Sequence, residues 1–429
     1  MNTIPPARRD GAWTDERSIA SALSQAGPGE TEEFWRSVAE SGTPLRGRDP
    51  RSATFVWRGP HARDRSDGST AVHLTMNRVT DKHRYENGYM RHVPGTDIWV
   101  RTLDLDPDLS VSYGFTPLGP GESPRPGPPR FDAYDRFLDP FNPTPPLVRS
   151  GDKGLSLLHG PQASPQPEWC DHSRRPLAGQ VRREARRLTA RDGDRTRPHW
   201  LYLPPSGPTT GRSGPLPLLT IFDAETWFGR LDLPRALEAA VQTGRLPPLA
   251  VLGIANESTA GRIASLGANS DFLGGVVGSS VPWAVSSVVA AGFVPPGRAE
   301  RVIAGQSLGG LSALVCALEF PQACAHVLSH SPSMWWTPDG TSKPKDLGSV
   351  PEEDWIVRRF SEGAVHDVSV SLAVGSLEGP SISHVHALDR VVRQRGWAAS
   401  SRMYPGGHDF AWWREALFDG LEAALGEAR

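Results

Sequence analysis

Near-continuous apolar runs in the second half of this chain constrain its fold more than any other feature. These runs are HWLYLPP (199–205), PLPLLTIFDAE (215–225), PPLAVLGIAN (247–256), ERVIAGQS (300–307) and VSVSLAVGSLE (368–378). Strands that are buried on both faces of a parallel sheet have this composition. The segments between them that look helical include 231–243, 309–320 and 411–425. The alternation predicts an open α/β layer fold, in which helices cover both faces of a mostly parallel sheet.

The first half of the chain has a different pattern. Its clearest segments, at 53–59, 70–79, 88–105 and 110–118, are short, rich in Val, Thr, Ile and aromatic residues, and separated by Gly, Asp and Pro turns. This pattern is typical of a small antiparallel β-sandwich. A chain of 429 residues is also longer than one typical domain. We therefore predict a tail or short first helix over 1–30, a sandwich domain over 31–165, a linker over 166–180 and an α/β domain over 181–429.

Composition excludes several classes of partner. The 46 Lys and Arg residues nearly balance the 48 Asp and Glu residues, so the formal net charge is −2 and predicts neither a nucleic-acid nor a membrane-surface partner. Cys170, Cys316 and Cys324 cannot form a disulfide framework or a C-x-x-C metal site, which favours a reducing compartment. The amino terminus lacks an apolar signal segment, and we identify no later run of membrane-span length. We expect a cytoplasmic protein without a bound metal or cofactor.

The stretch AGQSLGG (304–310) contains a G-x-S-x-G pattern centred on Ser307. In a chain this rich in glycine and serine, the pattern alone arises by chance about once. Its context is more specific, because a buried-strand signal precedes it and the helical pattern GGLSALVCALEF follows it. That order is typical of a nucleophile elbow, where side chains at Gly305 and Gly309 would clash. The alternative is a structural Gly-Ser-Gly turn.

A serine nucleophile needs a base, and histidine is the usual one at neutral pH. His408 lies in YPGGHDFAWWREAL, after the last strand-like segment and before the final helix. The base of an α/β hydrolase occupies this place in the chain, after the serine and the acid. The alternative is a histidine in an ordinary turn or at a helix cap.

The acid should lie between the serine and the histidine in sequence. Glu378 ends a strand-like run, so its side chain would reach the same edge of the sheet as Ser307. Asp367 at the beginning of that run and Asp389 in the next helix are the other candidates, and a solvated loop glutamate is the structural alternative. Asp409, which adjoins His408, is better placed to cap the final helix.

Two backbone N–H groups should form the oxyanion hole. One is the N–H of Leu308, the residue after the nucleophile. The other usually comes from the loop after an earlier strand, and TIFDAETWFG (220–229) offers Ala224 or Glu225.

The chain resembles the enterochelin (ferric enterobactin) esterase family over most of residues 34–425. In the second half the resemblance depends on FDAETWF, GRLPPLAVLGI, RVIAGQSLGGLSAL, HVLSHSPSMWW, GSLE and GGHDFAWWREAL. In the first half it depends on FVWRG, NRVTDKH, GTDIWVRTLDL, YGFTP and DPFNP. The SPSMWW and GGHDFAWWREAL blocks are far more specific than G-x-S-x-G.

The resemblance implies an all-β immunoglobulin-like sandwich followed by an α/β hydrolase domain. It also implies hydrolysis of the lactone esters of a catecholate trilactone siderophore, usually as its iron complex, which releases iron in the cell. Ser307 would be the nucleophile, His408 the base and Glu378 the acid. Trp335 and Trp336 would wall the substrate pocket, although large aromatics are as often core packing.

The chain departs from the family pattern around the substrate site. The family usually has Asp-Gly-Glu where this chain has Ala224 in the middle position, and SQSGS becomes SHSPS (329–333). Arg262 matches a family arginine, but the glutamate expected shortly after it is Ser265. These changes leave open which siderophore is the substrate.

A ferric tris-catecholate is trianionic, so its pocket should present nearby cations. The candidates close to motif segments are Arg262, Arg230, Arg402 and Arg414. The alternative for each is an ordinary surface arginine.

Two other functions remain open. One is a general carboxylesterase or acyltransferase of the same fold, because a fold does not determine function. The other is a non-catalytic binding protein that retains a ferric siderophore or a glycan through the sandwich. The family-like segments of the first half argue against a generic esterase, and the intact Ser, His and acid positions argue against a binding protein.

Overall fold

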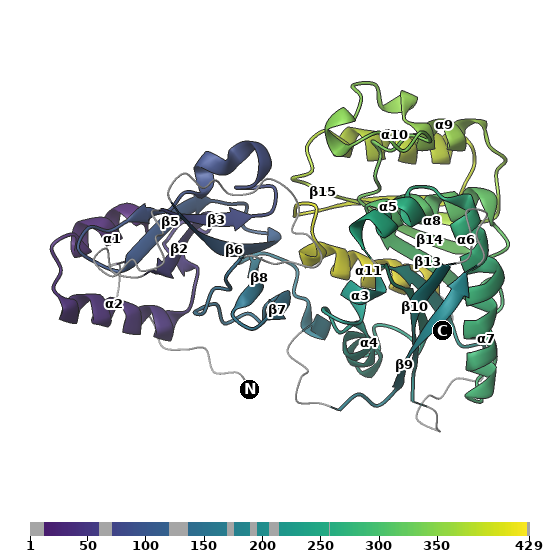
Figure 1. The fold of residues 1–429 in the computed structure, drawn as a ribbon, viewed down its shortest axis with the longest axis horizontal. Coiled ribbons are helices and arrows are strands. Elements are labelled where there is room, and N and C mark those ends of the chain that lie inside the picture. Colours follow the sequence, from purple (N-terminus) through teal and green to yellow (C-terminus); the bar gives the residue numbers. More distant parts are fainter. Residues whose placement is uncertain are drawn as a thin grey trace. The chain divides into compact units, whose positions relative to one another are not determined.

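The computed structural model describes residues 13–59, 71–119, 136–169, 176–188, 195–205, 214–256 and 258–426 (Figure 1). The chain divides into two compact units, an N-terminal unit (Met1–Ser164) and a C-terminal unit (Pro165–Arg429). Residues 1–12 of the predicted tail and 170–175 of the predicted linker lie outside the described residues.

The N-terminal unit contains two four-stranded antiparallel sheets, with strand orders β1-β2-β5-β4 and β3-β6-β8-β7. Aromatic side chains join the sheets, since Phe55 and Tyr113 meet edge to face with ring centroids 5.0 Å apart. The four predicted strand segments are confirmed, whereas β1, β7 and β8 were not predicted. The strands are β1 (Leu45–Arg46), β2 (Ser52–Arg58), β3 (Ala71–Met76), β4 (Arg91–His92), β5 (Ile98–Asp104), β6 (Ser110–Leu118), β7 (Val148–Ser150) and β8 (Lys153–His159).

Two helices, α1 (Glu16–Leu23) and α2 (Pro28–Ser41), pack on the first of these sheets. Ile19 of α1 and Phe34 of α2 are fully buried in one apolar cluster with Val56 of β2. The described part of the predicted tail is therefore a helix of the N-terminal unit. Burial of its apolar face explains this outcome, because apolar area removed from water stabilises even a short helix.

The C-terminal unit is built on an eight-stranded sheet of order β16-β15-β14-β13-β11-β12-β10-β9. The strands from β11 to β16 run parallel, and β9 and β10 are antiparallel. The mostly parallel sheet of the predicted α/β fold is thus confirmed. The strands are β9 (Gln180–Leu188), β10 (Arg195–Leu203), β11 (Leu218–Phe222), β12 (Ala250–Ile254), β13 (Arg301–Gln306), β14 (His326–His330), β15 (Ser369–Gly375) and β16 (Ala399–Tyr404).

Helices cover both faces of this sheet. On β15, Leu372 and Val374 belong to the large core cluster that contains α8, whereas Ala373 packs in a second cluster with Trp412 and Trp413 of α11. Successive strand residues point to opposite faces, so α8 and α11 lie on opposite sides. The helices are α3 (Ala224–Trp227), α4 (Leu233–Gln242), α5 (Thr259–Leu266), α6 (Ser270–Gly275), α7 (Val281–Ala290), α8 (Leu308–Glu319), α9 (Trp355–Glu362), α10 (Ser381–Gln394) and α11 (Phe410–Leu425).

One helical stretch corrects the expectation that no run reaches membrane-span length. Ser270–Ala290 is 21 residues long with a mean hydropathy of 1.5, which by length and composition would suffice to cross a membrane. It comprises α6, a π-helical turn (Val276–Ser280) and α7. Leu273 and Ala284 are fully buried in the core of the C-terminal unit, and a core helix passes the same test.

Candidate active site

Three predicted residues lie at the same edge of the parallel sheet. Ser307 follows β13, Glu378 follows β15 and His408 follows β16, while β14 lies between β13 and β15 (Figure 1). The carboxyl ends of parallel strands meet at one edge, where open α/β sheets bind their ligands. The strand order therefore brings together residues that are up to a hundred positions apart in the chain.

Ser307 occupies a sharp turn between β13 and α8. Its backbone has φ 58° and ψ −118°, a conformation that residues other than glycine rarely adopt. The turn is held by backbone hydrogen bonds, since the Ser307 N–H donates to the His330 carbonyl at 2.9 Å and Leu311 N–H donates to the Ser307 carbonyl at 3.0 Å. The side chain remains partly exposed. This strained, accessible serine has the geometry of a nucleophile elbow.

The glycine requirement at the elbow differs from the prediction. A Cβ on Gly305 would lie 2.2 Å from the Gly309 carbonyl oxygen, so Gly305 is required as predicted. A Cβ on Gly309 would find its nearest neighbour at 3.4 Å, in ordinary van der Waals contact, so that part of the prediction is wrong. Gly310 is the tighter position, because its Cβ would lie 3.0 Å from both the His330 carbonyl oxygen and Ser329 Oγ.

Glu378 and His408 form a close pair, with Glu378 Oε2 2.7 Å from His408 Nδ1. Glu378 is only 3% exposed. Burial alone would raise the pKa of its carboxyl group, but the charge and hydrogen bond of His408, with hydrogen bonds from Ser331 and the Gly375 N–H, outweigh burial and lower that pKa. The carboxylate is therefore kept ionised beside the imidazole. That arrangement would orient a general base and stabilise its protonated form.

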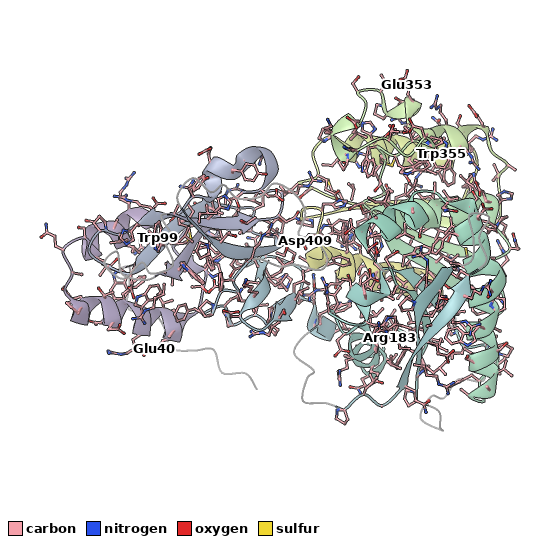
Figure 2. The ribbon with its side chains drawn as sticks, in the orientation of Figure 1. Glu40, Trp99, Arg183, Glu353, Trp355 and Asp409 are labelled. Atoms are coloured by element: carbon pink, nitrogen blue, oxygen red, sulfur yellow. The ribbon has the colours of Figure 1, made fainter. Side chains whose placement is uncertain are left out.

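The other acid candidates lie elsewhere. Asp367 has a fully exposed side chain and pairs with Arg298 at 3.1 Å. Asp389 pairs with Arg393 one turn later on α10, at 3.0 Å. Asp409, labelled in Figure 2, caps α11 as predicted, because its carboxylate accepts a hydrogen bond from the Ala411 N–H at 3.0 Å.

The predicted oxyanion donors begin two helices that follow the neighbouring strands β11 and β13. Leu308 is the first residue of α8 and Ala224 the first of α3, so both N–H groups lie at helix N-termini. The methyl group of Ala224 is fully buried. A Cβ built on Gly253 of β12 would lie 2.7 Å from it, so the glycine makes room for this methyl group within the fold.

Arg262 is almost buried and forms a bidentate ion pair with Asp223. Its Nε and Nη2 atoms lie 2.7 and 2.8 Å from the two carboxylate oxygens. Burial lowers the pKa of Arg262, but the charge of Asp223 outweighs burial and raises it. Asn256 donates to the same carboxylate at 2.7 Å, and its backbone N–H donates to Glu225 at 3.1 Å. The positive charge of Arg262 is thus matched within the protein.

The remaining predicted cations lie on other elements. Arg402 is exposed on the edge strand β16 and pairs with Asp419 at 2.5 Å. Arg414 is buried in α11, where it donates to Gln166. Arg230 is half-buried after α3. Among the described residues, no group of three or more His, Cys, Asp or Glu side chains could hold a metal ion.

The two predicted pocket tryptophans differ in burial. Trp336 belongs to the core cluster and meets Trp355, which Figure 2 labels, edge to face at 4.9 Å. Trp335 is half-buried against the same cluster. Trp336 is therefore a core-packing residue, the alternative to a pocket wall, whereas part of the Trp335 side chain is exposed to solvent. Ser265, which stands in place of the family glutamate, accepts a hydrogen bond from the buried Arg197.

Sequence reasoning missed three residues that contact this constellation. Ser331 and Ser333 follow β14, and Trp413 lies in α11. Their sequence signals were membership of the SPSMWW and GGHDFAWWREAL blocks and, for the two serines, the SHSPS departure near the substrate site, none of which assigned them a role.

Comparisons with known proteins agree over most of the chain. The family model described as enterochelin esterase, N-terminal, matches residues 52–169, and the one described as putative esterase matches residues 194–424. The chain is 35% identical to the iron(III) salmochelin esterase of Escherichia coli O6:H1, over 94% of this chain and 97% of that protein. It is 29% identical to the iron(III) enterobactin esterase of Escherichia coli K12, over 86% and 90%. The structure of the ferric enterobactin esterase from Salmonella typhimurium matches with a TM-score of 0.72 at 25% identity, over 92% of this chain and 98% of that one.

Proposed function

This chain belongs to the enterochelin esterase family, and from that premise we propose that Ser307, Glu378 and His408 form the catalytic triad of a serine esterase. The chain is a carboxylic ester hydrolase that acts on the ester bonds of a siderophore of the enterobactin or salmochelin type. The single observation that supports the triad best is the buried Glu378 carboxylate 2.7 Å from His408, at the same edge of the sheet as the strained turn at Ser307.

In this mechanism His408 accepts the proton of Ser307 as the serine oxygen attacks the ester carbonyl carbon. The N–H group of Leu308 and that of Ala224 or Glu225 stabilise the resulting oxyanion. The ester C–O bond then breaks, and His408 returns the proton to the departing alcohol. A water molecule then attacks the acyl-enzyme carbonyl carbon while His408 accepts a proton from the water. The bond to Ser307 Oγ breaks, His408 returns the proton to Ser307, and the acid is released.

We also propose that the C-terminal unit has the α/β hydrolase fold and that the N-terminal unit is an immunoglobulin-like sandwich. Supporting observations for the hydrolase fold are the elbow between β13 and α8 and the chain order of serine, acid and histidine. The proposed setting is the cytoplasm, where hydrolysis of the iron complex would release iron.

The function is tested with iron(III) enterobactin and iron(III) salmochelin, each also in iron-free form, while linear products are followed by chromatography. We expect the natural chain to open at least one lactone and Ser307→Ala to lose activity by at least about a thousandfold. A chain that cleaves only a small aryl ester would instead be a general carboxylesterase. Comparable hydrolysis by Ser307→Ala would exclude the triad.

A further inference from the structure

We propose that the turn Ser331-Pro332-Ser333, which follows β14, positions both ends of the triad: Ser331 holds the acid and Ser333 holds the nucleophile. This inference depends on the proposed triad, and it adds two positioning residues to it. Ser331 contacts the acid and no reacting atom, whereas Ser333 contacts the nucleophilic oxygen of Ser307.

The location of the turn makes this double role possible. β14 lies between β13, which leads to Ser307, and β15, which leads to Glu378. The backbone ties the turn to both neighbours: the Ser331 N–H donates to the Ala373 carbonyl of β15 at 2.7 Å, and the Ser333 N–H donates to the Ser307 carbonyl at 3.1 Å. Both serines are only 2% exposed, so water does not compete for their hydroxyl groups.

Ser331 has a defined hydrogen-bond direction. The indole Nε1–H of Trp413 can only donate, and it donates to Ser331 Oγ at 2.9 Å. The serine proton therefore points to Glu378 Oε1, which lies 2.5 Å from Ser331 Oγ. The Gly375 N–H donates to that same oxygen at 2.8 Å. Oε1 is thus occupied by two donors, and Oε2 is left for His408.

The backbone of Ser331 supports a functional interpretation. Its φ is 46°, a left-handed conformation that is costly for a residue with a side chain. Trp413 contacts the base as well, since its ring meets the His408 ring edge to face at 4.8 Å. The same tryptophan therefore contacts the base and, through Ser331, supports the acid.

Ser333 acts at the other end of the triad. Its Oγ lies 3.3 Å from Ser307 Oγ, a long hydrogen bond in which either atom can be the donor. When Ser307 gives its proton to His408, the Ser333 hydroxyl must be the donor. The Ser333 hydroxyl then holds the Ser307 side chain in one rotamer and stabilises the negative charge that develops on Ser307 Oγ.

The test compares Ser331→Ala, Ser333→Ala and Trp413→Phe with the matched control Ser329→Ala. Ser329 is a buried serine of β14 whose hydroxyl donates to the Gly310 carbonyl at 2.9 Å and contacts no member of the triad. The pH profile of kcat/KM is measured for each variant on the siderophore lactone, and thermal unfolding reports stability.

We expect Ser331→Ala to lower kcat/KM about tenfold, the effect of one buried hydrogen bond to a charged group. It should also move the acidic limb of the profile to higher pH, because a less stabilised Glu378 carboxylate holds the proton on His408 more strongly. Trp413→Phe should act in the same direction but more weakly. Ser333→Ala should lower kcat about threefold, as a long hydrogen bond is weak, without moving that limb.

The positioning role would be overturned if Ser331→Ala and Ser333→Ala had the same pH profile of kcat/KM as Ser329→Ala, at the same unfolding temperature. A fall in activity that follows lost stability, with an unmoved acidic limb in Ser331→Ala, would overturn it as well. Full activity in Ser307→Ala would instead contradict the triad itself, so the two proposals fail separately.

Discussion

Asp139 in the N-terminal unit and Glu378 in the C-terminal unit are both buried, hydrogen-bonded carboxylates, and their pKa values shift in opposite directions. Asp139 in the N-terminal unit accepts hydrogen bonds from the Thr43 hydroxyl and the Tyr113 hydroxyl, both at 2.8 Å, and from the Phe141 N–H at 3.1 Å. Burial raises the pKa of Asp139, and these hydrogen bonds only partly offset it. Glu378 accepts a similar number of hydrogen bonds, yet its pKa is lowered.

The difference between the two carboxylates is the imidazole of His408. At Asp139 neutral donors satisfy the buried carboxyl group but do not lower its pKa. A base that gains a proton during the reaction needs a partner that is already ionised. Asp139 therefore has the environment of a structural crosslink between strands and loops, and Glu378 has the environment that the acid of the proposed triad requires.

The largest expected effect separates the two roles by activity. Glu378→Gln keeps the shape of the acid but removes its charge, and we expect kcat to fall by about 10³- to 10⁴-fold, as for the acid of other triads. Asp139→Asn is the matched change in the other unit and should leave kcat within about twofold, because it lies outside the proposed triad. Turnover of the siderophore lactone measures both. If kcat of Glu378→Gln were within tenfold of the natural chain, Glu378 and Asp139 could not be assigned different roles.

The next effect concerns stability. Asp139→Ala would leave the Thr43 and Tyr113 hydroxyls and the Phe141 N–H without their acceptor, and we expect the N-terminal unit to lose about 3 kcal/mol, about 1 per hydrogen bond. Calorimetry of the full chain should show one transition shifted to lower temperature. Glu378→Gln, which retains an acceptor, should shift the other transition less. Equal shifts in both variants would argue that the two sites are equally structural.

Acid should also distinguish the units. Burial lowers the pKa of His73 in the N-terminal unit to about 4 and that of His330 in the C-terminal unit to about 3. Because the unfolded histidines bind protons first, each of these two histidines should cost its unit up to about 1.4 kcal/mol per pH unit as the pH falls below 6.5.

In acid the two carboxyl groups should contribute to stability with opposite signs. The raised pKa of Asp139 means that the folded N-terminal unit takes up this proton before the unfolded chain does, which adds stability as the pH falls. The pKa of Glu378 is lowered in the folded state, so its contribution to stability is lost as the pH falls. Calorimetry of Asp139→Asn and Glu378→Gln beside the natural chain, over a series of falling pH values, should show these two contributions. Contributions of the same sign would contradict the assignment.

The smallest effect compares single donors. Thr43→Ala removes one hydroxyl from Asp139, just as Ser331→Ala removes one from Glu378. We expect about 1 kcal/mol of lost stability from Thr43→Ala with unchanged kcat and pH profile. Loss of activity in the Thr43 variant, measured alongside its unfolding temperature, would show that the two carboxylates are not functionally distinct.

The strands show where local sequence is informative. The interior strands β11, β12, β13 and β15 are apolar on both faces, and the sequence predicted them. β9 and β16 are the two edges of the sheet, where one side faces no further strand, and both are largely exposed. An edge strand can therefore be charged, as QVRREARRL in β9 is, and an apolar pattern does not reveal it.

The sequence by itself predicted the α/β alternation, the turn at Ser307 and the chain order of the proposed serine, acid and histidine, because each can be recognised from patterns along the chain. Only the tertiary structure decided what supports them. Ser331 meets Glu378 across 47 positions and Trp413 across 82. The tertiary structure likewise showed that the tight contact predicted at Gly309 lies at Gly310. These contacts arise from the order of strands in the sheet, and that order is set by packing across the whole unit rather than by any local pattern.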